Sequence, residues 1–153
     1  MSLENKDQKI LNILQRNSRL SVRTIAKELT IPPTTIHSRI KRMEREGVIK
    51  GYTLMVNESK LGVGAKAFVF ISLSARSKKN DLEEIMGEIT LYPEVQEVCT
   101  LSGDWDILVK IKTKTTDDIG KFLVKNLRNI KGIDKTVTSI VFDTFKETPN
   151  IIL

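Results

Sequence analysis

The sequence has few of the side chains from which metal sites, disulfides and catalytic triads are built. Among its 153 residues it has one cysteine, Cys99, and one histidine, His37. A single cysteine excludes an intrachain disulfide, and these two residues supply too few ligands for a Cys/His metal centre. A catalytic triad could be built only around His37, where no acid and nucleophile are arranged at a suitable spacing. We therefore expect no enzyme activity, no catalytic residues, no metal and no cofactor.

Long apolar runs are also missing from the sequence. It contains no stretch of about 18 apolar residues, so we expect no membrane-spanning segment and no membrane partner. Residues 1–7 lack the apolar core of a signal peptide, and we expect a cytoplasmic protein. With 40% hydrophobic and 29% charged residues, the chain has the composition of a soluble globular protein. Its length fits one large domain or two small ones.

The positive charge is confined to the first third of the chain. Residues 1–52 carry 11 Lys and Arg against 5 Asp and Glu, whereas residues 53–153 carry 14 of each. The whole net charge of +6 therefore lies in the first segment. This asymmetry indicates a basic module for a polyanion, joined to a neutral domain. A lysine-rich surface without a partner is the alternative that charge alone leaves open.

Apolar spacing in this basic segment predicts three short helices. Residues 7–16 and 22–29 each carry an apolar stripe, and Ser21 is placed to cap the second helix. The third helix begins after a tight turn, with Pro33 in its first position, and stops at Gly47. Two helices joined by a short turn are typical of a helix-turn-helix, which places its second helix in the major groove of DNA.

The third predicted helix has one apolar side and one polar side. Ile36, Ile40 and Met43 form its buried seam. The opposite side carries small hydroxyl residues near its start and longer cations further along, flanked by two more basic residues: Thr34, Ser38, Lys41 and Arg45, with His37 and Arg42. The small residues allow close approach to a groove, and the cations reach phosphates or guanine edges. A purely structural three-helix bundle explains the seam but not this polar side.

The remainder of the chain predicts a linker and a second domain. We divide the sequence into residues 1–50, a strand-like linker at 51–64, and residues 65–153. The apolar residues between positions 48 and 56 must pack on the second domain or on a second copy of the chain.

Periodicity after the linker predicts the order βαββαβ. Strands are expected at 65–74, 95–101, 106–112 and 136–145, and helices at 81–91 and 116–129. This order is typical of a ferredoxin-like fold, in which two helices cover one face of a four-stranded antiparallel sheet. The chain is therefore expected to be an α+β protein. An RNA-binding domain of the same topology is disfavoured, because the strand at 106–112 has no aromatic residues.

Two features of this second domain indicate interactions. The uncovered sheet face is expected to carry apolar residues and to mediate self-association; the candidates are Phe68, Phe70, Leu108, Ile140 and Phe142. The turn at 102–106 reads Ser-Gly-Asp-Trp-Asp. A glycine with positive φ and one capping aspartate explain part of this turn. Two carboxylates for an ammonium group, with backbone N–H groups for a carboxylate, would suit an amino acid. Both interpretations remain open at this point.

The residues of these two motifs resemble a known family. Positions 36–52, IHSRIKRMEREGVIKGY, resemble the helix-turn-helix of the Lrp/AsnC transcription regulators. The turn at 102–106 is similar to the G-D-aromatic-D signature of their RAM domain. The resemblance implies homodimers joined through the RAM sheets, further assembly into tetramers or octamers, and small amino acids as effectors bound between dimers. Pro32 departs from the pattern, since the family usually has a capping residue such as Ser there.

The interpretation assigns residues to two sites. We expect phosphate contacts from Arg39, Lys41, Arg42 and Arg45, and base-edge or close backbone contacts from Thr34, Thr35, His37 and Ser38. A dimer would read half-sites about one helical turn apart on a pseudo-palindromic DNA operator. The resemblance places the effector site at Thr100, Leu101, Ser102, Gly103, Asp104, Trp105 and Asp106, at Thr136, Val137, Thr138, Ser139 and Ile140, and at Gly120 and Val124.

The sequence thus predicts an amino-acid-responsive, sequence-specific DNA-binding transcription regulator. An architectural DNA-binding protein that has no effector is the alternative.

Overall fold

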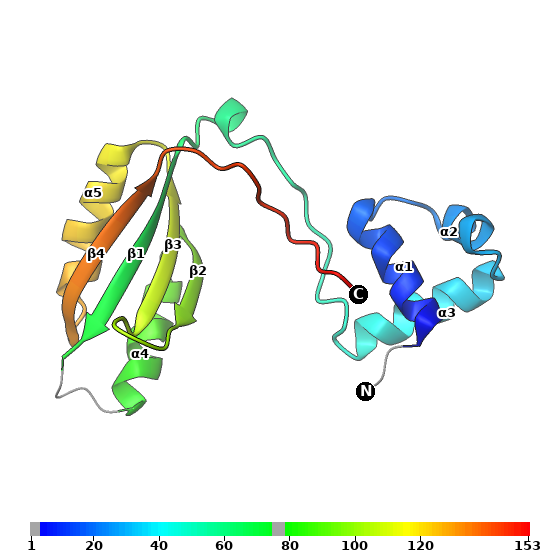
Figure 1. The fold of residues 1–153 in the computed structure, drawn as a ribbon, viewed down its shortest axis with the longest axis horizontal. Coiled ribbons are helices and arrows are strands. Elements are labelled where there is room, and N and C mark those ends of the chain that lie inside the picture. Colours follow the sequence, from blue (N-terminus) through cyan, green and yellow to red (C-terminus); the bar gives the residue numbers. More distant parts are fainter. Residues whose placement is uncertain (1–3, 75–78) are drawn as a thin grey trace. The chain divides into compact units, whose positions relative to one another are not determined.

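The computed structural model describes residues 4–74 and 79–153, which form two compact units (Figure 1). The first unit comprises the chain up to Met55 together with Lys146–Leu153, and the second comprises Val56–Phe145. The helices are α1 (Asn5–Arg16), α2 (Val22–Leu29), α3 (Pro33–Arg45), α4 (Lys79–Thr90) and α5 (Thr116–Lys125), with short 3-10 turns at Ser59–Leu61 and Leu127–Asn129. The strands are β1 (Ala65–Leu73), β2 (Val95–Thr100), β3 (Ile107–Thr113) and β4 (Ile133–Val141).

The first unit confirms the three helices expected in the basic segment. Their apolar stripes meet in one core, whose fully buried members are Ile10, Ile25, Ile36 and Met43. Ser21 caps α2 as predicted, because its hydroxyl accepts the Thr24 N–H at 3.1 Å. Pro33 occupies the first position of α3. Gly47 follows the end of that helix with φ of 72°, a conformation that favours glycine.

The last residues of the chain return to this first unit. The side-chain amide of Gln15 on α1 donates to the Ile151 carbonyl at 3.2 Å and accepts the Ile151 N–H at 2.7 Å. The tail is therefore held through its backbone, while the side chains of Ile151 and Ile152 remain largely exposed.

The linker differs from the strand-like segment that the sequence predicts. Residues 51–57 have no regular secondary structure, and the 3-10 turn at Ser59–Leu61 follows. A strand requires a neighbouring strand for its backbone hydrogen bonds, and the described part of one chain supplies none here. Leu54 and Met55 are 81% and 75% exposed. They remain free to pack on a second copy, which was one of the two expected partners.

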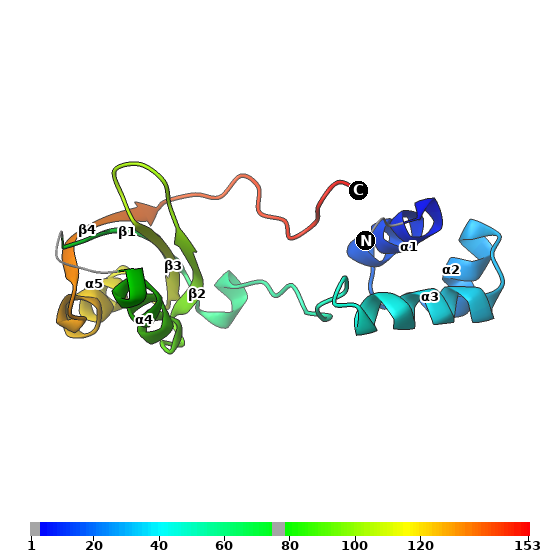
Figure 2. The ribbon, with the colours of Figure 1, turned by 90° about the horizontal axis from the view of Figure 1, so that it is seen from below.

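The second unit confirms the ferredoxin-like fold. Its antiparallel strands lie in the order β2-β3-β1-β4. Figure 2 shows α4 and α5 together on one side of the sheet, with the β2–β3 turn extending to the other side. Alternate residues of β1 and β3 point toward the helices and are fully buried, namely Ala67, Val69, Ile71, Ile107, Val109 and Ile111. This alternation matches the period of two that the sequence shows.

Two elements of this unit differ most from their expected ranges. The second helix of this unit ends at Lys125 instead of continuing to residue 129, and the 3-10 turn that follows brings Leu127 into the core with 0% exposure. The last strand is Ile133–Val141 rather than 136–145. Its pairing with β1 begins opposite Leu73 and ends at the Lys66–Val141 pair.

The strand register shows that the open face has a different set of residues from the set predicted from the sequence. Phe68 and Phe70 lie on it as expected, with Leu108 paired to Phe70. Ile140 is instead paired with the buried Ala67, so it belongs to the face that carries the helices. Phe142 lies beyond β4 and is 99% exposed. The positions of β4 that do face outward are Lys135, Val137, Ser139 and Val141, because they pair with Ser72, Phe70, Phe68 and Lys66.

Candidate functional site

The outer side of α3 is an exposed row of hydroxyl and basic residues. Its exposed members are Thr34, His37, Ser38, Lys41 and Arg45, and Thr35 is half-buried. The Ser38 hydroxyl donates to the Thr35 carbonyl at 3.0 Å, so it stays close to the helix surface. The helix therefore presents small groups at its start and long cations toward its end, as the sequence predicts.

One of these cations has an acidic partner on the same helix. The ammonium group of Lys41 lies 2.8 Å from a carboxylate oxygen of Glu44, and the Tyr52 hydroxyl donates to the other oxygen at 3.1 Å. These two hydrogen bonds, that from Lys41 first, lower the pKa of Glu44 below its usual 4.5. Lys41 remains 61% exposed and can change partner at low cost.

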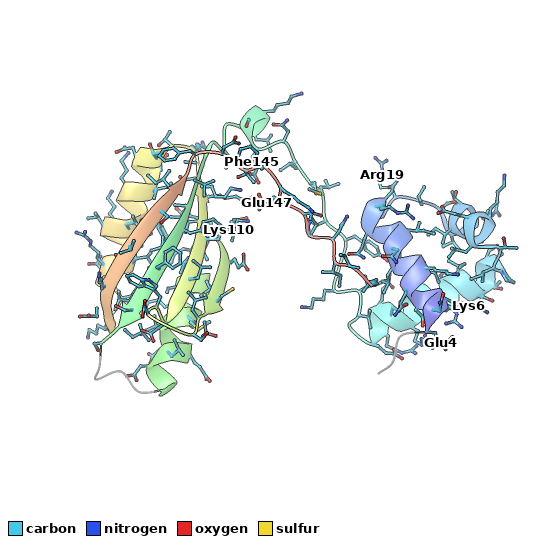
Figure 3. All side chains as sticks on the ribbon, in the orientation of Figure 1. Glu4, Lys6, Arg19, Lys110, Phe145 and Glu147 are labelled. Carbon is cyan, nitrogen blue, oxygen red and sulfur yellow. The ribbon has the colours of Figure 1, made fainter. Side chains whose placement is uncertain are left out.

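Arg39 and Arg42 are placed differently from the other basic residues of α3. Both lie on the flank that faces the start of α1, where their guanidinium groups contact Asp7 at 2.9 and 2.6 Å. Arg39 also contacts Glu4 at 2.9 Å; Figure 3 labels Glu4 at the end of α1 that lies beside α3. Hydrogen bonds to Asp7, and then to Glu4, raise the pKa of Arg39. Two of the four residues expected at phosphates, Arg39 and Arg42, are thus engaged within the unit.

The sequence interpretation did not include Asp7, whose side chain is fully buried. A signal for it exists in the pattern. Asp7 precedes Ile10, Leu11 and Leu14 by three, four and seven residues, which is the spacing of one helix face. An acid in an apolar stripe needs a buried cationic partner. Nothing in the local sequence says which of the 11 cations of this segment supplies it.

The β2–β3 turn is organised by Asp106. Its carboxylate accepts the Leu73 N–H at 2.7 Å, and its own N–H donates to the Ile71 carbonyl at 2.9 Å. The Leu101 N–H closes the turn on the Asp106 carbonyl at 2.8 Å. Gly103 has φ of 113°, which the turn requires of a glycine. These contacts bear out the structural interpretation for Gly103 and one aspartate, and they leave Asp104 exposed.

Trp105 of the same turn lies over the open face of the sheet. Its ring centroid is 6.0 Å from that of Phe70, and the Lys135 ammonium lies 5.4 Å above the indole. The turn, the open face and the start of β4 are therefore in contact through one indole ring. The structure brings these three elements together within one chain.

The other residues expected at the effector lie elsewhere on the unit. Gly120 and Val124 are on the outer surface of α5, where Val124 is 56% exposed. Thr136, Thr138 and Ile140 point to the helix side of the edge strand, whereas Val137 and Ser139 point to the open side. The turn and α5 are on opposite sides of the sheet (Figure 2). One chain therefore does not gather the whole expected set around one point.

Two cavities of the second unit are lined by other residues. A cavity of about 420 Å³ lies beside α5 and contains Lys112, Lys114 and Asp118 among its lining residues. Another of about 540 Å³ lies between Glu84 of α4 and Lys131. Neither includes a residue from the expected effector set.

The described residues also bear on metal binding and membrane insertion. Within 4–74 and 79–153, no three His, Cys, Asp or Glu side chains are grouped to hold a metal ion. His37 is an exposed side chain on α3. No helix in these same segments is long and apolar enough to cross a membrane.

Comparison with known domains matches both parts of the chain. Residues 3–50 match a winged helix-turn-helix DNA-binding domain, and residues 66–151 match the Lrp/AsnC ligand binding domain. In this chain the helix-turn-helix has no β-wing between residues 4 and 55, all of which the structure describes.

Similar proteins cover almost the whole chain. An HTH-type transcriptional regulator of Pyrococcus furiosus is 39% identical over 145 residues, which are 95% of this chain and 96% of the relative. The structure of AsnC from E. coli superimposes with a TM-score of 0.87 at 26% identity, covering 96% of this chain and 97% of the other. A transcriptional regulator of Neisseria meningitidis, solved as a complex with L-Met, shares the fold with a TM-score of 0.91 at 24% identity, covering 99% and 97%.

The two domains match in the expected order, and the relatives are transcriptional regulators rather than enzymes. The chain therefore belongs to the Lrp/AsnC family of DNA-binding transcription regulators.

Proposed function

We propose that this regulator responds to a small amino acid and binds specific DNA sequences. In this proposal residues 1–50 bind DNA, residues 51–64 link the domains, and residues 65–153 bind the effector and assemble the oligomer. Its place of action is the cytoplasm, where the DNA of its prokaryotic relatives lies. The observation that carries the proposal is the exposed outer side of α3, which has hydroxyl residues near its start and cations toward its end. The other domain of the chain matches a ligand binding domain.

The proposed DNA contacts follow from this side of α3. Thr34, Thr35, His37 and Ser38 are near the start of the helix, where short side chains allow the backbone to approach base edges. Lys41 and Arg45 extend further and suit phosphate oxygens. In a dimer, two such helices would meet half-sites of a pseudo-palindrome about one helical turn apart.

Apolar residues on the open sheet face support a dimeric arrangement. Phe68, Phe70 and Leu108 lie on that face, and Val137 beside them is 40% exposed. Apolar side chains on a sheet face that no helix covers favour association with a second copy of the chain. The exposed Leu54 and Met55 of the linker add apolar area that a second copy would cover. We propose a dimer and, from it, tetramers or octamers.

The effector site in this proposal lies between dimers. The residues expected there occupy opposite sides of one sheet, so only a second copy can bring a turn and an α5 surface to the same ligand. Both carboxylates of the turn are exposed. We assign the ammonium group to Asp104, because the Asp106 carboxylate already accepts the Leu73 N–H. The neighbour solved with L-Met supports an amino acid as the class of ligand. Its binding would alter either assembly or the affinity for DNA.

Isothermal titration calorimetry of the full chain against each of the twenty amino acids tests this function. We expect saturable heat from one amino acid or a few related ones, and a change in DNA affinity or in sedimentation when that amino acid is present. Saturable heat should vanish in Asp104→Ala. If no amino acid gives saturable heat while DNA still binds, the chain is an architectural DNA-binding protein without an effector.

A further inference from the structure

Asp7 is a buried carboxylate that two arginines of α3 neutralise. Its side chain is 0% exposed, and each of its oxygens receives one guanidinium, Arg39 at 2.9 Å and Arg42 at 2.6 Å. A buried carboxylate without such partners would be strongly disfavoured. The first turn of α1 and the middle of α3 are therefore joined by charge-assisted hydrogen bonds between residues 32 and 35 positions apart.

These contacts leave little of either guanidinium for DNA. The side chains of Arg39 and Arg42 are 19% and 32% exposed, against 61% for Lys41. The Nε atoms of both arginines are also buried and without a hydrogen-bond partner. An N–H group that is out of reach of solvent is out of reach of a phosphate as well.

The two arginines lie next to the outer side of α3 in the helix. Arg39 and Arg42 are three residues apart, so they lie on one flank of α3. Lys41 directly precedes Arg42, and Arg45 lies three residues beyond it. If the flank were released from Asp7, a rotation of the helix would move these two outward cations together.

We propose that Asp7 is a positioning residue for DNA reading, which fixes the rotation of α3 through Arg39 and Arg42. On this proposal the two arginines do not bind phosphates, and the phosphate contacts of the helix are left to Lys41 and Arg45. The inference rests on the proposed function, in which the outer side of α3 meets DNA.

Two matched variants of the full chain separate positioning from phosphate contact. Arg42→Gln and Arg45→Gln each remove one positive charge from α3. Their affinities are measured over a range of salt concentrations for a duplex selected from a random-sequence pool by the wild-type protein, and for a scrambled duplex of equal length. The temperature is kept where circular dichroism shows every variant fully folded.

The proposal makes opposite predictions for the two variants. Arg45→Gln should lower the slope of log K against log salt by about 0.9 for each phosphate that the helix no longer neutralises. Arg42→Gln should leave the slope unchanged and lower the ratio of selected to scrambled affinity by about tenfold, comparable to the effect of one mismatched base pair. A fall in slope for Arg42→Gln equal to that for Arg45→Gln would overturn the proposal.

Asp7→Asn and Arg42→Lys complete the test. Arg42→Lys keeps a charged donor for Asp7 and should retain most of the affinity ratio. Asp7→Asn alone should lower the ratio of selected to scrambled affinity. In a protein that already carries Arg42→Gln, adding Asp7→Asn should lower this ratio by a smaller factor. An unchanged ratio in Asp7→Asn, with only a lower melting temperature, would show a purely structural role and overturn the proposal. If Lys41→Gln and Arg45→Gln also leave the slope unchanged, the proposed DNA face itself fails and both inferences are overturned.

Discussion

The proposed DNA-reading face and the proposed effector site differ in how much of each is present in one chain. The face lies on a single helix, whose starting proline, apolar seam and flanking ion pairs all come from the same unit. The effector residues lie on a turn, an edge strand and the outer side of a helix, on both sides of one sheet. The first site therefore depends on local folding, and the second depends on assembly.

The largest effect is expected from a charge on the open sheet face. Phe70→Glu places a carboxylate among apolar side chains that we expect to pack against a second copy. The variant should sediment as a monomer, and its affinity for a two-half-site duplex should fall by about a hundredfold or more, because the second head no longer binds intramolecularly. Analytical ultracentrifugation and fluorescence anisotropy measure the two effects.

Leu91→Glu is the matched control for this change. Leu91 is a large apolar residue, 81% exposed, that directly follows α4 and is not part of the open face. It should keep the wild-type assembly and DNA affinity. A dimeric Phe70→Glu variant, or a monomeric Leu91→Glu variant, would show that the chain associates through another surface.

The two acids of the β2–β3 turn should respond differently to removal. Asp104→Ala should abolish saturable amino-acid binding with an unchanged melting temperature, because the exposed carboxylate makes no contribution to the turn. Asp106→Ala should lower the free energy of unfolding by about 1 kcal/mol, because the Leu73 N–H is left without its acceptor. Calorimetry and chemical denaturation measure both properties. Equal decreases in stability in the two variants would contradict this division of roles.

A smaller effect is expected from the cap that fixes the helix-turn-helix. Ser21→Ala removes the acceptor for the Thr24 N–H and should lower the free energy of unfolding of the first unit by about 1 kcal/mol. Ser18→Ala, a change at an exposed serine of the preceding turn, is the control and should have little effect. The amino-acid affinity should be the same in both. If Ser21→Ala weakened effector binding as much as DNA binding, the effector site would depend on the folding of the first unit, contrary to this prediction.

The smallest effect is expected from the acid beside Lys41. The pKa of Glu44 is lowered in the folded state, so its contribution to stability is present above the pKa of the unfolded chain and is lost as the pH falls through the folded value. Glu44→Gln should therefore reduce the loss of stability of the first unit in acid, as followed by circular dichroism. It should also strengthen DNA binding slightly, because Lys41 no longer has a competing partner. Unchanged acid sensitivity would contradict this assignment.

The sequence predicted what depends on neighbouring residues. The Ser21 cap, the Pro33 helix start and the alternation along β1 are local patterns, and the structure confirms them. The four-stranded antiparallel sheet with helices on one face followed from the sequence of elements. Only part of the role of Asp106 was predicted. A capping aspartate was expected in the turn, but the hydrogen bond from the Leu73 N–H to its carboxylate was not.

What depends on distant residues could not be predicted. Ile140 was expected on the open face, and only the pairing with Ala67 shows that it belongs to the other one. The Asp7 contacts join residues more than 30 positions apart. The helical pattern of α3 alone therefore could not show that Arg39 and Arg42 contact an acid of α1. The linker was expected to be strand-like because of its composition, but a strand also needs a partner.

Amino-acid binding by a monomeric form of the chain tests the contrast between the two sites most directly. Phe70→Glu, or a second open-face variant such as Leu108→Glu if the first associates, is titrated with the amino acid that gives saturable heat with the wild type. We predict no saturable heat from the monomer, together with DNA binding that still weakens as salt rises. A monomer that binds the amino acid with wild-type affinity would contradict this contrast, because one chain would then hold a complete effector site.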